Sequence, residues 1–251
     1  MAKSPPSVLA FAASDPTGGA GVQADLLTLA ARGCHPLSVV TALTVQDTHG
    51  VERVEPVDAG LVAEQARRVL ADVRAAAFKL GVLGSAENAS AIAAILAAHA
   101  GAPVVVDPVL ASGRGDALAD EETVAVMNGE LFPLTAVATP NTLEAERLGG
   151  VSAMIAAGCR YVLLTGTHAR EAEVVNRLYD ARGLVREDRW PRLPGSYHGS
   201  GCTLASALAA ALARGLPMAE AARDAQDYTW HALEAGFRPG AGQSIPQRFF
   251  T

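Results

Sequence analysis

The chain has 251 residues, of which 50% are hydrophobic and 18% are charged, so it can bury a sizeable core. Its formal net charge of −6 gives no basic footprint for nucleic acid or for an anionic membrane. The three cysteines, Cys34, Cys159 and Cys202, are widely spaced and form no ligand-like pair, which argues against a disulfide framework or a zinc site. Reduced thiols favour a cytoplasmic protein. The longest apolar stretch, Ala89–Val106, is interrupted by a histidine and a proline, so it indicates a helix followed by a strand rather than a membrane span.

The first quarter of the chain alternates strand and helix patterns. Ser7–Ala13 is an apolar strand, and apolar residues recur at helical spacing over Gly21–Ala31. Pro36–Leu43 is a second buried strand, and Val51–Val57 is a more exposed, alternating one. Asp58 suits the N-cap of a helix that reaches about residue 73.

The same alternation continues to the C-terminus. Short strands that each follow a helix-like segment are expected at Phe78–Leu83, Val104–Asp107, Ala136–Thr139 and Tyr161–Thr165. Val174–Tyr179 and Leu184–Trp190 flank a turn and predict an antiparallel hairpin. Two alanine-rich helices are expected at about Ser200–Arg214 and Met218–Ala235.

This β-α-β order predicts an α/β fold of three layers, with a mostly parallel central sheet, helices on both faces and a small antiparallel hairpin. No linker, charge block or repeat divides the sequence, so a single domain over residues 1–251 is expected. In such sheets ligands bind at the carboxyl ends of the strands.

A glycine-rich loop follows the first strand, from Ser14 to the helix that holds Asp25. Its spacing matches neither the P-loop pattern nor the dinucleotide-binding pattern. Asp25 lies one helical turn after Gly21, where it could face the cleft and hold a substrate hydroxyl. It could equally be a solvated first-turn carboxylate that favours the helix dipole, and spacing alone does not decide between the two.

Acidic residues follow two later strands. Asp107 comes directly after a run of three valines, and Asn141 and Glu144 come after the next strand. Carboxylates on adjacent strand ends suit Mg²⁺, which binds through one or two of them with water and phosphate oxygens. Asn141 and Glu144 also have the spacing of a capping box, which is a strong structural alternative.

The most informative segment is His198-Gly199-Ser200-Gly201-Cys202-Thr203, which leads into an apolar helix. Small residues before a helix leave backbone N–H groups free, and with the helix dipole these form a ready anion site. Such amides stabilise a transferring phosphoryl group electrostatically. Cys202 lies in this first turn, where the dipole is expected to lower its thiol pKa. Taken alone, the segment is more often a structural turn with a buried cysteine.

Together these segments resemble the hydroxymethylpyrimidine/phosphomethylpyrimidine kinases of thiamine biosynthesis, within the ribokinase superfamily. The matching pieces occur in the family's order and span nearly the whole chain: 14–25, 39–43 with 46–48 and 50–51, 79–81, 107–109, 115–116, 139–141 with 144, and 198–203. Most ribokinase-type sugar kinases have aspartate where Cys202 stands, and cysteine is typical of the pyrimidine kinases. The resemblance implies a ribokinase-like fold, ATP and Mg²⁺ as cofactors with a monovalent cation as an option, and a homodimer.

The resemblance also implies roles for single residues. The substrate would be bound by Asp25 at its hydroxymethyl group, by Gln46 at its aminopyrimidine edge, and by Gly21, Gly81, Val82 and Val109 around the ring. Gly199, Ser200, Gly201 and Cys202 would form the anion hole, with Cys202 as the candidate base. ATP would contact Asn141, Thr165, Arg114 and Thr203, and Asp107 and Glu144 would organise Mg²⁺.

Two departures from the family pattern concern ATP. Thr165 stands where many relatives have a lysine near the ATP phosphates, and Arg114 could supply the missing cation. The nearest alternative activity is that of a pyridoxal kinase, which also phosphorylates a hydroxymethyl group on a flat heteroaromatic ring. Gln46 favours the aminopyrimidine. A non-catalytic ligand-binding relative is the alternative from another class, and the acidic residues with Cys202 argue against it.

Overall fold

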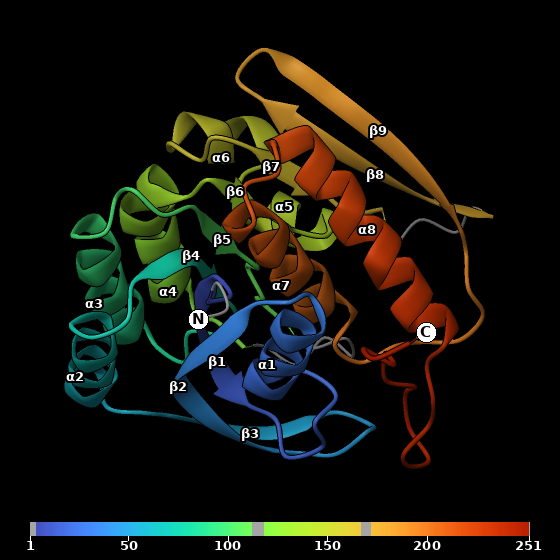
Figure 1. Cartoon of the computed structure of the whole chain (residues 1–251), viewed down its shortest axis with the longest axis horizontal. Coiled ribbons are helices and arrows are strands. Elements are labelled where there is room, and N and C mark those ends of the chain that lie inside the picture. Colours follow the sequence, from blue (N-terminus) through green and yellow to red (C-terminus); the bar gives the residue numbers. More distant parts are fainter. Residues whose placement is uncertain (1–3, 112–117, 167–171, 251) are drawn as a thin grey trace.

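The computed structural model describes residues 4–111, 118–166 and 172–250. Nine strands formed by these residues join one sheet, in the order β3-β2-β1-β4-β5-β6-β7-β8-β9 (Figure 1). The strands are β1 (Ser7–Ser14), β2 (His35–Gln46), β3 (Val51–Pro56), β4 (Ala75–Leu80), β5 (Val104–Val106), β6 (Val137–Ala138), β7 (Val162–Leu164), β8 (Glu173–Asp180) and β9 (Gly183–Pro191).

The centre of the sheet is parallel and both edges are antiparallel. Strands β2, β1, β4, β5, β6 and β7 pair in parallel, whereas β3 runs antiparallel to β2 and the β8–β9 hairpin continues antiparallel from β7. This confirms the predicted α/β fold and its hairpin. Strand β2 extends past its predicted end at Leu43 because β3 pairs with it there, with Thr44 opposite Val54 and Gln46 opposite Val51.

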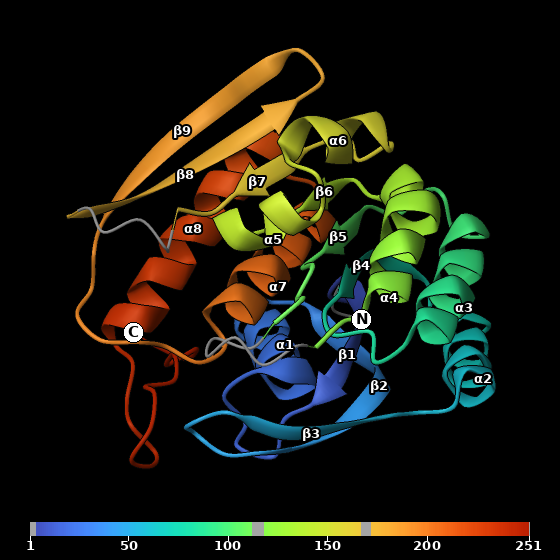
Figure 2. The same ribbon diagram turned by 180° about the vertical axis from the view of Figure 1, so that it is seen from behind.

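Helices cover both faces of the sheet, as expected for a doubly wound fold (Figures 1 and 2). One face carries α1 (Gly21–Ala31), α7 (Ser200–Ala213) and α8 (Met218–Glu234). The opposite face carries α2 (Ala59–Leu70), α3 (Ala86–Ala97), α4 (Glu121–Val126), α5 (Thr142–Arg147) and α6 (Val151–Ala156). A π-helical turn and a 3-10 turn continue α4 through residues 127–134.

Two hydrophobic cores lie on the two faces of the sheet, because successive side chains of a strand point to opposite sides. Leu9 and Phe11 of β1 pack with α2 and α3, whereas Val8 and Ala10 pack with α1 and α7. Strands that are buried on both faces explain why the sequence shows continuous apolar runs rather than alternation.

Helix and strand ends agree with local chemistry. Asp58 caps α2 by accepting a hydrogen bond from Leu61 N at 2.9 Å, as predicted. Strand β4 runs from Ala75 to Leu80, so it begins and ends earlier than the predicted range of 78–83. Residues 81–84 leave the strand at its carboxyl end, where Gly84 has φ +87°. The early exit allows Val82 to line a cavity, whereas Leu83 packs in the hydrophobic core.

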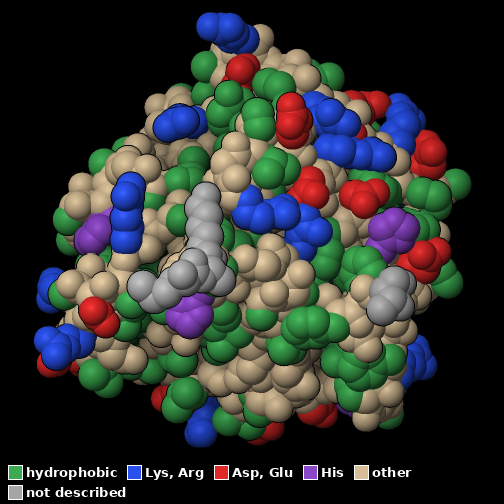
Figure 3. Space-filling model, viewed as in Figure 1, with side chains coloured by type: hydrophobic (Ala, Val, Ile, Leu, Met, Phe, Trp, Pro, Cys, Tyr) green, Lys and Arg blue, Asp and Glu red, His purple; other side chains and the backbone are tan. Residues whose placement is uncertain are grey.

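On the face shown in Figure 3, basic and acidic side chains lie beside one another. The β8–β9 hairpin illustrates this pattern, because Arg186 and Arg223 both bind Asp188 and Arg177 binds Glu187. Among the described residues, no helix is both long enough and apolar enough to cross a membrane.

Candidate active site

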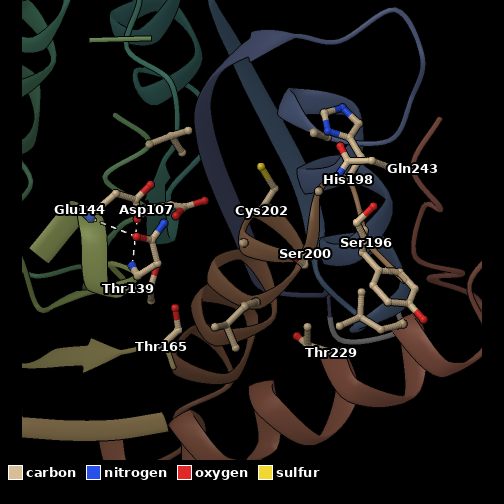
Figure 4. Close-up of a pocket in the computed structure, with 18 of the residues that line it drawn as sticks. Asp107, Thr139, Glu144, Thr165, Ser196, His198, Ser200, Cys202, Thr229 and Gln243 are labelled. Carbon is tan, nitrogen blue, oxygen red and sulfur yellow. Dashed lines mark hydrogen bonds between the residues drawn. The ribbon is translucent and has the colours of Figure 1, made fainter. Parts of the chain in front are cut away.

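A cavity of about 830 Å³ lies at the carboxyl ends of the parallel strands. It is lined by residues that follow β1, β5 and β6, and by the N-terminal turn of α7. In Figure 4, Asp107, Thr139 and Glu144 lie on one side of this cavity, and Ser196, His198 and Gln243 lie on the other. Helix α7 begins between them, with Ser200 and Cys202 in its first turn. The cavity therefore brings together residues from many separate segments, as the strand-end rule predicts.

The N-terminus of α7 presents free backbone amides to the cavity. Gly199 is the N-cap in the left-handed conformation, with φ +82°, and a Cβ there would collide with the carbonyl of Gly19. Thr203 N donates the first helical hydrogen bond, to Gly199 O at 3.0 Å, so the N–H groups of Ser200, Gly201 and Cys202 precede the helical ladder. This is the geometry expected of an anion hole.

Asp107 and Glu144 form an acidic wall opposite these amides. The Asp107 side chain is 4% exposed, and its Oδ2 has no hydrogen-bond partner, nor has the neighbouring Thr139 Oγ1. Burial raises the pKa of Asp107 to about 6, while Lys79 opposes the shift. Burial and the nearby Asp107 raise the pKa of Glu144 to about 8. Two desolvated carboxyls, one of which has an oxygen without a hydrogen-bond donor, are suited to a cation.

The capping box predicted as a structural alternative is also present. Asn141 N donates to Glu144 Oε2 at 2.9 Å, and Glu144 N donates to Asn141 Oδ1 at 3.0 Å. One carboxylate oxygen of Glu144 is thus used at the start of α5 while the residue still lines the cavity. Thr165 N donates to Pro140 O at 2.9 Å, which holds the end of β7 beside this cap.

Asp25 does not face the cleft. It is fully buried, its carboxylate pairs with Lys79 Nζ at 2.8 Å, and it accepts a hydrogen bond from Ser206 Oγ at 2.8 Å. The spacing leaves open a cleft-facing and a solvated position, and the structure shows neither, because Asp25 is fully buried and does not line the cavity, whereas its partner Lys79 does. Gly81 also contacts this buried pair, since a Cβ at Gly81 would lie 2.7 Å from Lys79 Nζ.

The loop after β1 is tied to the anion hole by a pair that the sequence did not single out. His198 Nε2 lies 2.9 Å from Asp15 Oδ2, and the same carboxylate accepts from Thr17 N at 2.8 Å and Ala20 N at 2.7 Å. Burial alone would raise the pKa of Asp15, but these hydrogen bonds, led by that of His198, hold it below its usual value. Asp15 is therefore ionised and accepts a hydrogen bond from His198 Nε2.

At one end of the cavity lie Gln46, Gly21, Val82 and Val109, four of the residues predicted to bind the substrate ring. Gln46 Nε2 donates to Thr44 Oγ1 at 2.8 Å, and that hydroxyl donates to Ser14 O at 2.8 Å. Because the Thr44 hydroxyl gives its only hydrogen to Ser14 O, its oxygen can only accept, and the amide nitrogen of Gln46 is therefore the side that faces Thr44.

At the other end lie Thr165 and Asn141, two of the predicted ATP contacts. Thr203 does not line the cavity, and its hydroxyl donates to Gly199 O at 2.7 Å, so it supports the anion hole from behind. Arg114, the fourth predicted contact, lies outside the described residues. Gln226 on α8 was missed; its amide bonds Asn176, Trp190 and Asp188 and so attaches the β8–β9 hairpin to this end of the cavity.

The pKa of Cys202 is opposite to the prediction. Burial raises it to about 12, although the adjacent Lys79 lowers it. Desolvation outweighs the dipole of α7 at this position, and Asp25 and Asp107 add further repulsion to a thiolate. The Cys202 thiol is therefore protonated at neutral pH.

Comparison with known proteins identifies the family of this site. Residues 15–247 match the family described as phosphomethylpyrimidine kinase. The chain belongs to this family. It is 41% identical to the hydroxymethylpyrimidine/phosphomethylpyrimidine kinase of Streptomyces coelicolor. The alignment of 254 residues covers 95% of this chain and 92% of that protein. The recognition made from the sequence is thereby confirmed.

Two solved kinase structures have the same fold as this chain. The phosphomethylpyrimidine kinase of Clostridium difficile has a TM-score of 0.76 and 32% identity over 91% of this chain and 99% of that one. The pyridoxal kinase of Staphylococcus aureus, in complex with AMP-PCP and pyridoxal, has a TM-score of 0.89 and 25% identity over 98% and 94% of the two chains. The backbone thus resembles both groups of kinases, and the choice between their substrates falls to side chains.

Proposed function

We propose that this kinase transfers the γ-phosphoryl group of ATP to 4-amino-5-hydroxymethyl-2-methylpyrimidine, or to its monophosphate, in thiamine biosynthesis. One observation carries the proposal: a single cavity is lined by Gln46 at the end of β2, by Thr165 after β7, and by residues 199–202 at the start of α7. Helix α7 contacts strands β1, β4 and β5, which lie between β2 and β7 in the sheet. A ring at the Gln46 end and a triphosphate at the Thr165 end would meet at the amides of residues 199–202. The kinases named above support the assignment of both ligands.

Gln46 accounts for recognition of the aminopyrimidine. One Nε2 hydrogen of Gln46 is bonded to Thr44, and its Oε1 is available to accept a hydrogen bond. The 4-amino group of the pyrimidine, next to the hydroxymethyl carbon, is a matching donor. The flat ring would lie between the apolar side chains of Val82 and Val109, which line the same end of the cavity.

The transfer itself would be promoted chiefly by placement and by electrostatics. The γ-phosphoryl group carries its charge on its equatorial oxygens, and the N–H groups of residues 199–202 point to the region where these would lie. Because these amides are already fixed by the left-handed Gly199, little reorganisation accompanies the reaction.

We assign Cys202 to contact with the attacking hydroxyl. A protonated thiol cannot be a preformed base, and a loose transition state requires little early deprotonation of the alcohol, so positioning carries more of the barrier. A base role would require substrate binding to ionise the thiol. The pH dependence of turnover distinguishes these two roles.

Asp107 and Glu144 fit a divalent cation, since the orphaned Oδ2 of Asp107 and the raised pKa values of both carboxyls mark a site short of positive charge. The described residues contain no cluster of three or more His, Cys, Asp or Glu side chains that could hold a metal. Mg²⁺ would therefore be held by these two carboxylates together with water and phosphate oxygens, and it would neutralise charge on the phosphates.

Pyridoxal kinase activity is the second candidate, and the structural likeness to a pyridoxal complex favours it. Pyridoxal carries a formyl group beside its hydroxymethyl arm, and the formyl oxygen is an acceptor. It would face the Gln46 Oε1, which is also an acceptor, so this contact disfavours pyridoxal.

A steady-state assay with ATP, Mg²⁺ and each of the two alcohols tests the proposal, with Gln46→Leu as the paired variant. We expect a higher kcat/KM for the pyrimidine and a loss of that preference in the variant. A higher kcat/KM for pyridoxal in the unmodified protein would contradict the substrate assignment.

Three further proposals concern the domain organisation, the oligomeric state and the cellular location. We propose a single kinase domain, since all nine strands of the described residues join one sheet, a homodimer, and a cytoplasmic location. Sedimentation equilibrium measures the assembly, and fractionation of cells measures the location.

A further inference from the structure

Arg248 is a buried arginine that reaches the back of the anion hole from the C-terminal segment after α8. It is only 3% exposed. Its Nε donates to Thr203 Oγ1 at 3.2 Å, and its Nη2 donates to Gly19 O at 2.5 Å. One guanidinium thus contacts both the first turn of α7 and the loop after β1, which are separated by most of the chain.

Both of its contacts lead directly to the amides of the hole. The Thr203 hydroxyl that accepts from Arg248 donates in turn to Gly199 O, at 2.7 Å. The carbonyl of Gly19 lies directly against Gly199, where a Cβ would collide with it, and such a Cβ would lie 3.0 Å from Arg248 Nη2. Arg248 therefore holds two sides of the left-handed N-cap from which the amides of residues 200–202 are aimed.

The charge of Arg248 has no direct counter-ion among the described residues. In the part of the chain that the structure describes, no carboxylate lies within salt-bridge distance of its guanidinium. Its backbone is anchored, because Tyr228 Oη donates to Arg248 O at 2.7 Å. Its more distant charged neighbours are Asp15, which is hydrogen-bonded to His198, and Asp25, which is paired with Lys79. A buried cation without a partner normally destabilises a fold, so an anion in front of it is the expected compensation.

We propose that Arg248 is a positioning residue for phosphoryl transfer: it fixes the left-handed N-cap of α7 through Gly19 and Thr203 and places a positive charge behind the anion hole. The inference rests on the proposed kinase activity. It concerns the transferring phosphoryl group rather than the pyrimidine or the nucleotide base.

The experiment compares Arg248→Gln, which removes the charge, with Arg248→Lys, which keeps it. Phe249→Ala is the matched control, since Phe249 is the next residue and is 59% exposed. For Arg248→Gln we expect kcat to fall by roughly 10- to 100-fold, with KM for ATP and for the pyrimidine within about threefold of the original. Arg248→Lys should recover a substantial part of kcat, and Phe249→Ala should leave it unchanged.

A double-mutant cycle with Thr203→Val adds a readout that a purely structural role would not move. If Arg248 acts through Thr203, the double variant should lose less kcat than the product of the two single losses, measured well below each unfolding midpoint. An unchanged kcat in Arg248→Gln, an equal loss in Gln and Lys variants, or losses that multiply would each overturn the proposal. If Arg248→Gln does not fold, Arg248→Lys and the cycle built on it decide the matter. Absence of kinase activity in the unmodified protein would instead refute the proposed function.

Discussion

Lys79 and Asp25 form an ion pair in the centre of the protein, with Nζ at 2.8 Å from Oδ1 and 2.9 Å from Oδ2. Both side chains are 0% exposed, and Ser206 on α7 adds a hydrogen bond to the same carboxylate. Burial would lower the pKa of Lys79, but Asp25, with Cys202 and Asp107, raises it well above its usual value. The ammonium therefore stays charged and joins β4 to α1 beneath the floor of the cavity.

Removing one partner of this pair should strongly destabilise the protein. We expect Lys79→Met to lower the free energy of unfolding by about 3–5 kcal/mol, because it leaves the Asp25 carboxylate buried without a counter-ion. Urea denaturation followed by circular dichroism measures the loss. Arg53→Ala is the control, since Arg53 and Glu55 form an exposed pair, and it should change stability by less than about 1 kcal/mol. Equal effects in the two variants would contradict this account of the pair.

Stability should depend on pH through Glu144 and Asp107. Their pKa values in the folded protein, about 8 and about 6, lie above the values of 4.5 and 3.8 that are usual for these groups. The folded state thus holds more protons than the unfolded state between about pH 4 and 8, and its stability falls as pH rises through this window. We expect Glu144→Gln to flatten the fall in melting temperature between pH 5.5 and 8.5, whereas Glu64→Gln on the exposed side of α2 should not.

Mg²⁺ provides the second half of this test. A cation bound between the two carboxylates favours their ionised forms, so it should raise the melting temperature more at pH 8.5 than at pH 5.5. The effect should disappear in the Asp107→Asn, Glu144→Gln double variant. A stabilisation by Mg²⁺ that is the same at both pH values, or that persists in the double variant, would speak against these residues as its ligands.

Cys202 should be important for turnover and unreactive toward alkylation. We expect Cys202→Ala to lower kcat by roughly 10- to 100-fold with little change in substrate KM, as for a lost positioning contact. With its pKa raised to about 12, the thiol should react slowly with iodoacetamide at pH 7. Unchanged turnover in Cys202→Ala would refute the contact, and a kcat that rises with thiolate fraction across pH 7–10 would restore the base role.

The two glycines of the anion hole should respond differently to alanine. Gly201→Ala should fold normally, since its Cβ would lie 3.4 Å from Asp107 Oδ2, in ordinary contact, yet kcat should fall because the methyl group narrows the hole. Gly199→Ala should lose more stability than the ~1–3 kcal/mol of a strained backbone alone, since it adds a collision with Gly19. Gly33→Ala is the matched control, because Gly33 has φ +76° and nothing within 4 Å of its Cβ position. Similar melting temperatures for Gly199→Ala and Gly33→Ala would show that the close approach to Gly19 is unimportant.

Local patterns predict much of this fold. Helix α1 begins and ends at the residues where apolar spacing places it, Gly21–Ala31, and α2 starts after its predicted cap, Asp58. Both depend on neighbours within one helical turn. The end of β2 was predicted too early because it depends on β3, whose antiparallel pairing is not encoded in β2 itself.

The contacts of the site that the sequence did not predict are long-range, including the partner of His198, a residue that the sequence places beside the anion hole. Lys79 pairs with a residue 54 positions away, His198 with one 183 positions away, and Arg248 with one 229 positions away. Each looks ordinary in its own segment, although a lysine inside the apolar run of β4 was a usable signal, because lysine is almost never buried unless it is paired. The pKa of Cys202 was predicted with the wrong sign because burial, which the sequence does not reveal, outweighs the helix dipole.

The central claim is that this site phosphorylates an aminopyrimidine alcohol, and its most direct test is the ratio of kcat/KM for 4-amino-5-hydroxymethyl-2-methylpyrimidine to that for pyridoxal, at saturating ATP and Mg²⁺. The account predicts a ratio well above 1 that falls toward 1 in Gln46→Leu, since Gln46 Oε1 accepts from the amino group and repels the formyl oxygen. A ratio below 1 in the unmodified protein would contradict it.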